Sequence, residues 1–277
     1  MITIDNDNNI VIPFDEKRIN YEFSYFLDKH GKLGGINKYN FIIKFFQQNI
    51  FYKKELELCN NEKIFNKIIN NRIKYLNKSI DELTSEDILQ GFKRSGIYYG
   101  YGHFNPLLIK WFYERYNIKS CYDPCGGWGH RLLGSLDLDL YIYNDLSKTT
   151  FDNINQMIKY FNLECITKTY NNDASKFIPN DYFEAMFTCP PYFNLEHYEC
   201  GDFESIEDYY KFINSLFDIF YKKETCKIFG LVIREDLLED KWKEKSNEQI
   251  LLDINRSAHI SKGGKHKLKE YIYIFKK

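Results

Sequence analysis

The sequence has few of the residues that break or cross-link a chain. Only 6 of its 277 residues are proline and 7 are cysteine, an odd number with no Cys-x-x-Cys pair. This pattern argues against a disulfide framework and a cysteine zinc site, and it favours a reducing compartment. No apolar run reaches the roughly 18 residues of a membrane-spanning helix, and no signal peptide is visible. We therefore expect a cytoplasmic protein that has no membrane segment and binds no metal.

An excess of one charge sign is also lacking, because the formal net charge is only -1. The charges are nevertheless unevenly distributed along the chain. Residues 29–78 contain 11 lysines or arginines and 3 glutamates, and residues 254–277 contain 7 lysines or arginines and a single glutamate. Two basic ends either hold a phosphate backbone or are simply solvated, and net charge does not decide between these readings.

Apolar and aromatic residues, in contrast, are abundant at 44% and 18%. They suffice for the core of one catalytic domain with an extension. Apolar residues at spacings of three and four predict helices within residues 15–95, with capping boxes at Ser79 and Thr84. A segment rich in glycine and aromatic residues then breaks the pattern. We therefore predict a helical N-terminal extension over residues 1–95 and a catalytic domain over residues 96–277.

From Pro106 onward, predicted strands and helices alternate. Strands are expected to end at Asp123, Asp145, Asp173 and Thr188, and helices follow the first, second and fourth of them. Such alternation predicts an α/β fold, with a mostly parallel sheet and helices on both faces. The last two predicted strands are joined by a Gly-Gly turn and predict a C-terminal antiparallel hairpin.

Residues that could bind a ligand or take part in catalysis lie at these strand ends, where parallel sheets bind ligands. The stretch DPCGGWG starts at Asp123, and its glycines let the backbone approach a ligand closely. Asp145, 16 residues after Gly129, is placed to accept hydrogen bonds from both hydroxyls of a ribose. The fourth strand leads into Cys189–Tyr192, or CPPY. Its two prolines fix two φ angles and donate no N–H, so they form a rigid exit whose carbonyls remain available as acceptors.

The stretches HFNP, DPCGGWGHRLLGS and TCPPYFNLEHY resemble motifs of adenosylmethionine-dependent methyltransferases that act on exocyclic amines of DNA bases. Similar methylases are common in phages and mobile elements. The resemblance covers roughly residues 98–277. It implies a Rossmann-like class I fold with a seven-stranded sheet, and S-adenosyl-L-methionine as the cofactor. The positions that match the family's cofactor-binding elements are Phe104, Asn105, Pro106, Asp123, Cys125, Gly127, Gly129, Asp145, Leu146, Asp173 and Ala174.

The same resemblance implies a catalytic role for Cys189, Pro190, Pro191 and Tyr192. An exocyclic amine is a poor nucleophile because its lone pair is delocalised, and acceptors such as the Pro190 carbonyl let the nitrogen become tetrahedral. Tyr192 would stack on a base flipped from DNA, which is worth about 1–3 kcal/mol. Further substrate contacts are expected from Phe193, Glu196, Lys262 and Lys265.

Cys189 departs from the family pattern, which has Asp, Asn or Ser before the two prolines. A thiol is a weak acceptor and is closest in shape to serine. In the family that the chain resembles, serine at this position tends to accompany cytosine N4 methylation, and Asp or Asn adenine N6, so the resemblance favours cytosine. Three alternatives stay open: an RNA base amine, a protein glutamine amide, and C5 methylation of cytosine with Cys189 as the nucleophile. A binding module without catalysis would lose the cofactor glycines and acids, which are all present.

Target recognition is expected from the extension. The segments from Tyr192 to Glu204 and from Glu235 to Glu248 are too short to hold a recognition domain. The basic residues of the extension, interleaved with aromatics such as Phe45, would contact the DNA backbone and make affinity fall steeply with salt.

Overall fold

The computed structural model describes residues 3–4, 10–11, 15–17, 19, 40–47, 61–94, 104–193, 202–252 and 269–277. The chain divides into two compact units, Met1–His103 and Phe104–Lys277. The sequence-based boundary at residue 95 lies somewhat earlier than this division. The predicted substrate contacts Glu196, Lys262 and Lys265 lie outside the described residues.

The first unit contains a short antiparallel pair and several helices. The pair is β1 (Thr3–Ile4) with β2 (Ile10–Val11), and the helices are α2 (Asn40–Phe46), α5 (Glu62–Leu76), the 3-10 turn η2 (Ile80–Glu82) and α6 (Ser85–Arg94). Both predicted capping boxes are confirmed. The backbone N–H of Ser79 donates to Glu82 at 2.7 Å, and that of Thr84 donates to Asp87 at 3.0 Å.

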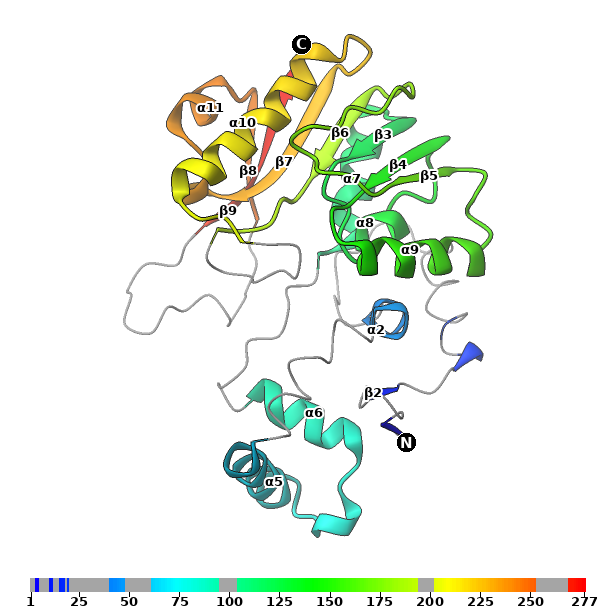
Figure 1. The fold of residues 1–277 in the computed structure, drawn as a ribbon, viewed down its shortest axis with the longest axis vertical. Helices are drawn as coiled ribbons and strands as arrows, with labels where there is room; N and C mark the ends of the chain where they lie inside the picture. Colours follow the sequence, from blue (N-terminus) through cyan, green and yellow to red (C-terminus); the bar gives the residue numbers. More distant parts are fainter. Residues whose placement is uncertain are drawn as a thin grey trace. The chain divides into compact units, whose positions relative to one another are not determined.

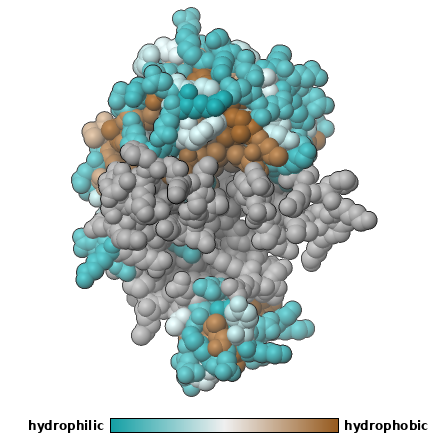
Figure 2. Space-filling view, turned by 180° about the vertical axis from the view of Figure 1, so that it is seen from behind, coloured by the Kyte–Doolittle hydropathy of each residue, from teal (hydrophilic) through white to brown (hydrophobic). Residues whose placement is uncertain are grey.

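Helices α5 and α6 pack closely because Gly91 has no side chain. A Cβ at this position would lie 2.6 Å from Cγ2 of Ile68. The other side of α5 carries the exposed Lys63, Lys67 and Lys74. In Figure 2 the α5–α6 pair, at the bottom of the view, shows mainly hydrophilic residues, so this pair presents a largely solvated, basic surface.

The second unit is built on a seven-stranded sheet of order β5-β4-β3-β6-β7-β9-β8 (Figure 1). Five strands are parallel: β3 (Ser120–Asp123), β4 (Leu140–Asn144), β5 (Thr167–Tyr170), β6 (Ala185–Thr188) and β7 (Ile228–Arg234). Strand β9 (Glu270–Lys276) runs antiparallel to both β7 and β8 (Glu248–Leu252). The predicted α/β, Rossmann-like class I sheet with its antiparallel C-terminal strands is therefore confirmed.

Helices cover both faces of this sheet. On one face lie α7 (Pro106–Tyr116), α8 (His130–Leu133) and α9 (Lys148–Tyr160), and Phe112 of α7 packs on Phe187 of β6 with ring centroids 4.9 Å apart. On the other face lie α10 (Ile206–Lys222), the turn η3 (Glu235–Leu237) and α11 (Asp240–Lys245). Phe217 of α10 stacks on Trp242 of α11 at 3.6 Å and contacts Phe229 of β7 at 5.4 Å. Among the described residues no helix is both long and apolar enough to cross a bilayer.

Strand β5 is shorter than the sequence predicts, ending at Tyr170 and not at Asp173. The two asparagines that follow use their polar groups outside the strand ladder. The Asn171 side chain donates to the carbonyl of Asp145 at 2.7 Å, and the N–H of Asn172 donates to the side chain of Asn144 at 3.0 Å. Because these groups bond to Asp145 and to the side chain of Asn144 at the end of β4, the chain leaves the sheet early and Asp173 lies in the loop after β5.

Candidate functional site

The four predicted strand ends lie at one edge of the sheet, since the strands are parallel. Strand β3 leads into the cofactor-type loop, residues 124–129, and β6 leads into the Pro-Pro loop, residues 189–193. Strands β3 and β6 are neighbours, and the strand order reverses its direction between them. This switch point is where open α/β sheets bind ligands.

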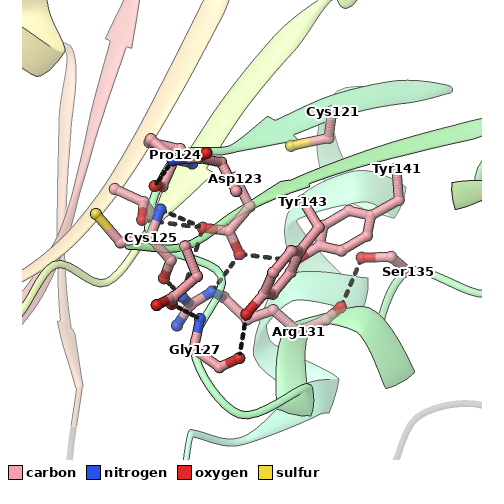
Figure 3. A network of polar contacts seen from close by, with 12 residues as sticks. Cys121, Asp123, Pro124, Cys125, Gly127, Arg131, Ser135, Tyr141 and Tyr143 are labelled. Atoms are coloured by element: carbon pink, nitrogen blue, oxygen red, sulfur yellow. Dashed lines mark hydrogen bonds and ion pairs between the residues drawn. The ribbon is translucent and has the colours of Figure 1, made fainter. Parts of the chain in front are cut away.

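The side chain of Asp123 links the loop after β3 to the end of β6, and Figure 3 shows its contacts with Arg131 and Tyr141. It is fully buried and accepts from Nε of Arg131 at 2.6 Å and from the hydroxyl of Tyr141 at 2.7 Å. It also accepts from Oγ1 of Thr188 at 3.0 Å and from the N–H of Cys125 at 3.3 Å. Protein donors therefore occupy the carboxylate that the sequence predicts to contact the cofactor, and this carboxylate ties the loop after β3 to the end of β6.

Arg131 is the partner of Asp123 that the sequence analysis missed. The residue is 5% exposed, and Nη2 of its guanidinium also donates to the carbonyl of Cys125. Burial opposes its charge, but Asp123 outweighs that effect and raises the pKa of Arg131. A signal was present, because Arg131 stands in the first turn of α8, where a cation is unfavourable unless it has an acidic partner.

The segment before α7 approaches the same site. The ring of Phe104 lies 5.1 Å from the guanidinium of Arg131 and 6.0 Å from the ring of Phe187. Asn105 caps α7 by accepting from the N–H of Leu107 at 3.0 Å, and Pro106 begins the helix. The predicted cofactor element thus lies against Arg131 of α8 and Phe187 of β6.

The three glycines of this loop are each required for a different physical reason. Gly127 has φ +62°, and a Cβ there would meet nothing closer than 3.8 Å, so its backbone is open to a ligand. Gly129 also has a positive φ, of +99°, and its added Cβ would lie 2.9 Å from Ile154 of α9. At Gly126 a Cβ would overlap the ring of Tyr143, at 2.1 Å. Only Gly127 therefore leaves free space where a ligand would approach.

Asp145 follows β4 beside the open glycine. One carboxylate oxygen accepts from the N–H of Gly127 at 2.8 Å and the other from the N–H of Ser147 at 2.9 Å. Burial raises the pKa of the Asp145 carboxyl above its usual value of 3.8, although these two donors act against that effect. The next residue, Leu146, is an apolar side chain that is 50% exposed. A half-exposed leucine beside a carboxylate is suited to bind a nucleoside. The leucine would contact the flat base, and the carboxylate would accept hydrogen bonds from the sugar.

Asn144 is a second residue that the sequence analysis missed. It is fully buried, and its Nδ2 donates to the carbonyls of Pro124 at 2.9 Å and Asn172 at 3.0 Å. Its Oδ1 accepts from the N–H of Asn172 at 3.0 Å. One amide thus holds the loops after β3 and β5 to the end of β4.

Asp173 lies in the loop after β5. Desolvation acts to raise the pKa of its carboxyl, but hydrogen bonds from Ser175 and Lys176 outweigh it and the pKa is lowered. The ammonium of Lys176 lies 2.9 Å from the carboxylate. The side chain therefore stays ionised and half-exposed, and the following Ala174 is buried.

The Pro-Pro loop is less open than its sequence suggests. Pro190 is buried, and Tyr192 is only 6% exposed. The hydroxyl of Tyr192 donates to the carboxylate of Glu270 at the start of β9 and lies 3.7 Å from Sγ of Cys189. Glu270 did not emerge from the sequence, because it lies in a strand 78 residues further along the chain.

No family model matches this chain, and a comparison with curated proteins finds no similar sequence. Solved structures do resemble it. A human methyltransferase 10 domain containing protein shares 10% identity with it at a TM-score of 0.45, over 61% of this chain and 80% of that one. The human Mettl16 catalytic domain in complex with MAT2A 3′UTR hairpin 6 shares 8% identity at a TM-score of 0.43, over 62% of this chain and 69% of that one. Similarity at this level does not identify a substrate.

In the described part of the chain, no group of three or more His, Cys, Asp or Glu side chains is arranged to hold a metal ion. The cysteines of that part, among them Cys125 and Cys189, form no disulfide.

Proposed function

We propose that this protein is an adenosylmethionine-dependent methyltransferase that methylates the exocyclic amine of a DNA base, at cytosine N4 or adenine N6. The observation that carries the proposal is the double attachment of Asp123. Its carboxylate binds the N–H of Cys125 in the cofactor-type loop and the hydroxyl of Thr188, which directly precedes the Pro-Pro loop. A methyl donor and an amine held by these two loops would meet at the switch point of the sheet.

The residues at the carboxyl edge fit adenosylmethionine. Gly127 has the open backbone that a ligand needs, and Asp145 has one acceptor position left on each oxygen for the ribose hydroxyls. The exposed Leu146 and the half-exposed Asp173 would border the adenine. When bound, the cofactor supplies an electrophilic methyl group on a sulfonium.

The Pro-Pro loop would orient the amine. Among the described residues, no donor reaches the carbonyl of Pro190, which leaves it available to accept an amine hydrogen. Cys189 supplies a weak acceptor beside it. The chain's contribution is then placement, because fixing two reactants in line removes much of the entropic barrier.

A nucleic-acid partner is supported by the first unit. Lys63, Lys67 and Lys74 are exposed on α5 and lie at helical spacings that put them on one side. With the predicted Lys262 and Lys265, they would contact phosphates without reading sequence.

The proposal is tested by incubating the protein with DNA and labelled adenosylmethionine, digesting the DNA, and separating the nucleosides by mass spectrometry. N4-methylcytosine or N6-methyladenine is expected. RNA and a glutamine-containing peptide are assayed in parallel. If label appears only in the RNA or only in the peptide, that molecule is the substrate and DNA is not. If the well-folded protein binds no cofactor by calorimetry, the proposal is refuted.

Cys189→Ser is expected to keep or increase the rate of methyl transfer, because a hydroxyl is a better acceptor than a thiol. Cys189→Ala, which has no acceptor, is the matched variant and should be slower than Cys189→Ser. Complete loss in both variants, together with covalent trapping of the wild-type protein on 5-fluorocytosine DNA, would instead establish C5 methylation with Cys189 as nucleophile.

Cofactor affinity is expected to depend on pH through Asp145. The ribose hydroxyls stabilise the ionised carboxylate, whose pKa in the free protein is raised above 3.8 by burial. Affinity is therefore fully present above the raised pKa and is lost as the pH falls through it, with proton release on binding in that window. Calorimetry with adenosylhomocysteine at decreasing pH measures this loss. Asp145→Asn should bind weakly throughout and show no such slope, and a wild-type affinity independent of pH would contradict the assignment.

A further inference from the structure

Two buried polar groups that have no hydrogen-bond partner among the described residues belong to side chains whose neighbours contact the Pro-Pro loop. Among the described residues, five buried side-chain nitrogen or oxygen atoms have no hydrogen-bond partner, and they include Nη1 of Arg234 and the hydroxyl of Tyr209. A buried donor that makes no bond is destabilising, so proteins rarely keep one without a use. Both residues reach the loop through their neighbours.

Arg234 is the last residue of β7, at the carboxyl edge of the sheet, and is 8% exposed. Its Nε donates to Asp236 at 2.9 Å, and its Nη2 donates to the other oxygen of the same carboxylate. This side-on ion pair neutralises the charge of the guanidinium and leaves Nη1 without a hydrogen-bond partner among the described residues. In the sheet register Arg234 is paired with Glu270, which accepts from the hydroxyl of Tyr192.

Tyr209 belongs to α10 and is fully buried. Its ring lies 6.0 Å from that of Phe193, the last described residue of the Pro-Pro loop. Burial raises the pKa of its hydroxyl well above the usual value, and the carboxylate of Asp236 adds to that effect while Arg234 opposes it. The hydroxyl therefore stays protonated and is able to donate.

Arg234 and Tyr209 suit a different ligand from the phosphates that the basic residues of α5 would contact. A guanidinium already paired with Asp236 has no net charge to offer a phosphate, but its remaining N–H groups still bind a neutral acceptor well. In both cytosine and adenine, the carbon that carries the amine also carries a ring nitrogen with a free lone pair. An amine held by the Pro-Pro loop brings that ring nitrogen along with it, next to the same loop.

We propose that Arg234, oriented by Asp236, donates a hydrogen bond from Nη1 to the ring nitrogen adjacent to the methylated amine, and that the Tyr209 hydroxyl contacts the same edge of the base. This inference rests on the proposed function and deepens it. Arg234 and Tyr209, which we call the base reader, would recognise a base by donating to cytosine N3 or adenine N1. The base reader disfavours the edge of guanine at which the neighbouring ring nitrogen carries a hydrogen.

The test compares each natural base with its deaza analogue, in which that ring nitrogen is a C–H group: 3-deazacytosine and 1-deazaadenine, in oligonucleotides. Wild-type protein is expected to methylate the analogue at least about tenfold more slowly, because a buried donor then loses its partner. In Arg234→Lys the natural substrate slows, and the ratio between natural base and analogue approaches 1. Comparing ratios cancels the intrinsic difference in reactivity between the two bases.

Tyr209→Phe is the second variant and keeps the ring. It should reduce kcat/KM on the natural base without lowering the melting temperature, because the hydroxyl has no partner within the described protein. Matched controls are Tyr210→Phe, the next residue on α10, and Arg115→Lys, whose side chain is 48% exposed and paired with Glu248. Both controls should retain the wild-type ratio.

The outcomes separate this inference from the proposed function. If wild-type protein methylates a base but Arg234→Lys keeps the full discrimination against the analogue, the base-reading role is overturned while the function stands. If Tyr209→Phe lowers the melting temperature, its hydroxyl has a structural partner and is removed from the reader. If wild-type protein methylates no base in any nucleic acid, or only a glutamine amide, the proposed function fails and the reader fails with it.

Discussion

Replacing Arg131 with methionine is expected to lower the free energy of unfolding by about 3–5 kcal/mol. The substitution keeps most of the side-chain volume but leaves the carboxylate of Asp123, which is 0% exposed, without its cationic partner. Tyr141 and Thr188 still donate to that carboxylate, but neither carries a charge. The measurement is denaturant unfolding followed by circular dichroism.

Arg115→Met is the matched control for this expectation. Arg115 forms an ion pair with Glu248 at 2.8 Å, but it is 48% exposed, and such surface pairs contribute about 0–1 kcal/mol. Removing both buried charges, in Arg131→Met with Asp123→Asn, should cost less than the sum of the single changes. Equal losses in Arg131→Met and Arg115→Met would show that the Asp123 pair does not stabilise the fold.

Gly126→Ala is expected to abolish most cofactor binding, by about tenfold or more in affinity, and to destabilise the fold by about 1–3 kcal/mol through overpacking. The new methyl group would lie 2.1–2.2 Å from ring carbons of Tyr143, which is fully buried. The hydroxyl of that ring donates to the carbonyl of Gly127 at 2.8 Å, so displacing the ring also moves the open glycine. Calorimetry with adenosylhomocysteine measures the loss.

A second substitution tests the steric reason. In Gly126→Ala with Tyr143→Leu, the overlap is relieved, and stability should recover relative to Gly126→Ala alone. Gly127→Ala serves for comparison, because its Cβ has no contact closer than 3.8 Å and only the positive φ of 62° is strained. If Tyr143→Leu gives no recovery, crowding at this ring is not the reason that position 126 is glycine.

The backbone of the site could be predicted from the sequence because it depends on local patterns. The strand before Asp123, the glycines after it and the Pro-Pro pair all act within a few residues, and each was correctly placed at a strand end. The carboxyl edge then follows from parallel strands alone. Strand β5 was predicted too long, because nothing local shows that Asn171 and Asn172 bond to the end of β4 and the residue after it.

The contacts within the site could not be predicted, since they join distant residues. Thr188 is 65 residues from Asp123, and Glu270 is 78 residues from Tyr192. The sequence gives no sign that Tyr192, expected to face a base, is almost fully buried with its hydroxyl on a carboxylate. Arg131 and Asn144 are single polar residues whose partners, Asp123, Pro124 and Asn172, come from other segments, so their roles appear only in the folded chain.

The shared carboxylate of Asp123 has a thermodynamic consequence for any two ligands bound by the loops it joins. A ligand that shifts the loop after β3 acts on Asp123, and through Thr188 on the start of the Pro-Pro loop. If the first ligand changes the affinity of the second by some factor, the second changes the affinity of the first by the same factor. In Thr188→Val, which has no hydroxyl to reach Asp123, such cooperativity would shrink while each ligand kept its own contacts.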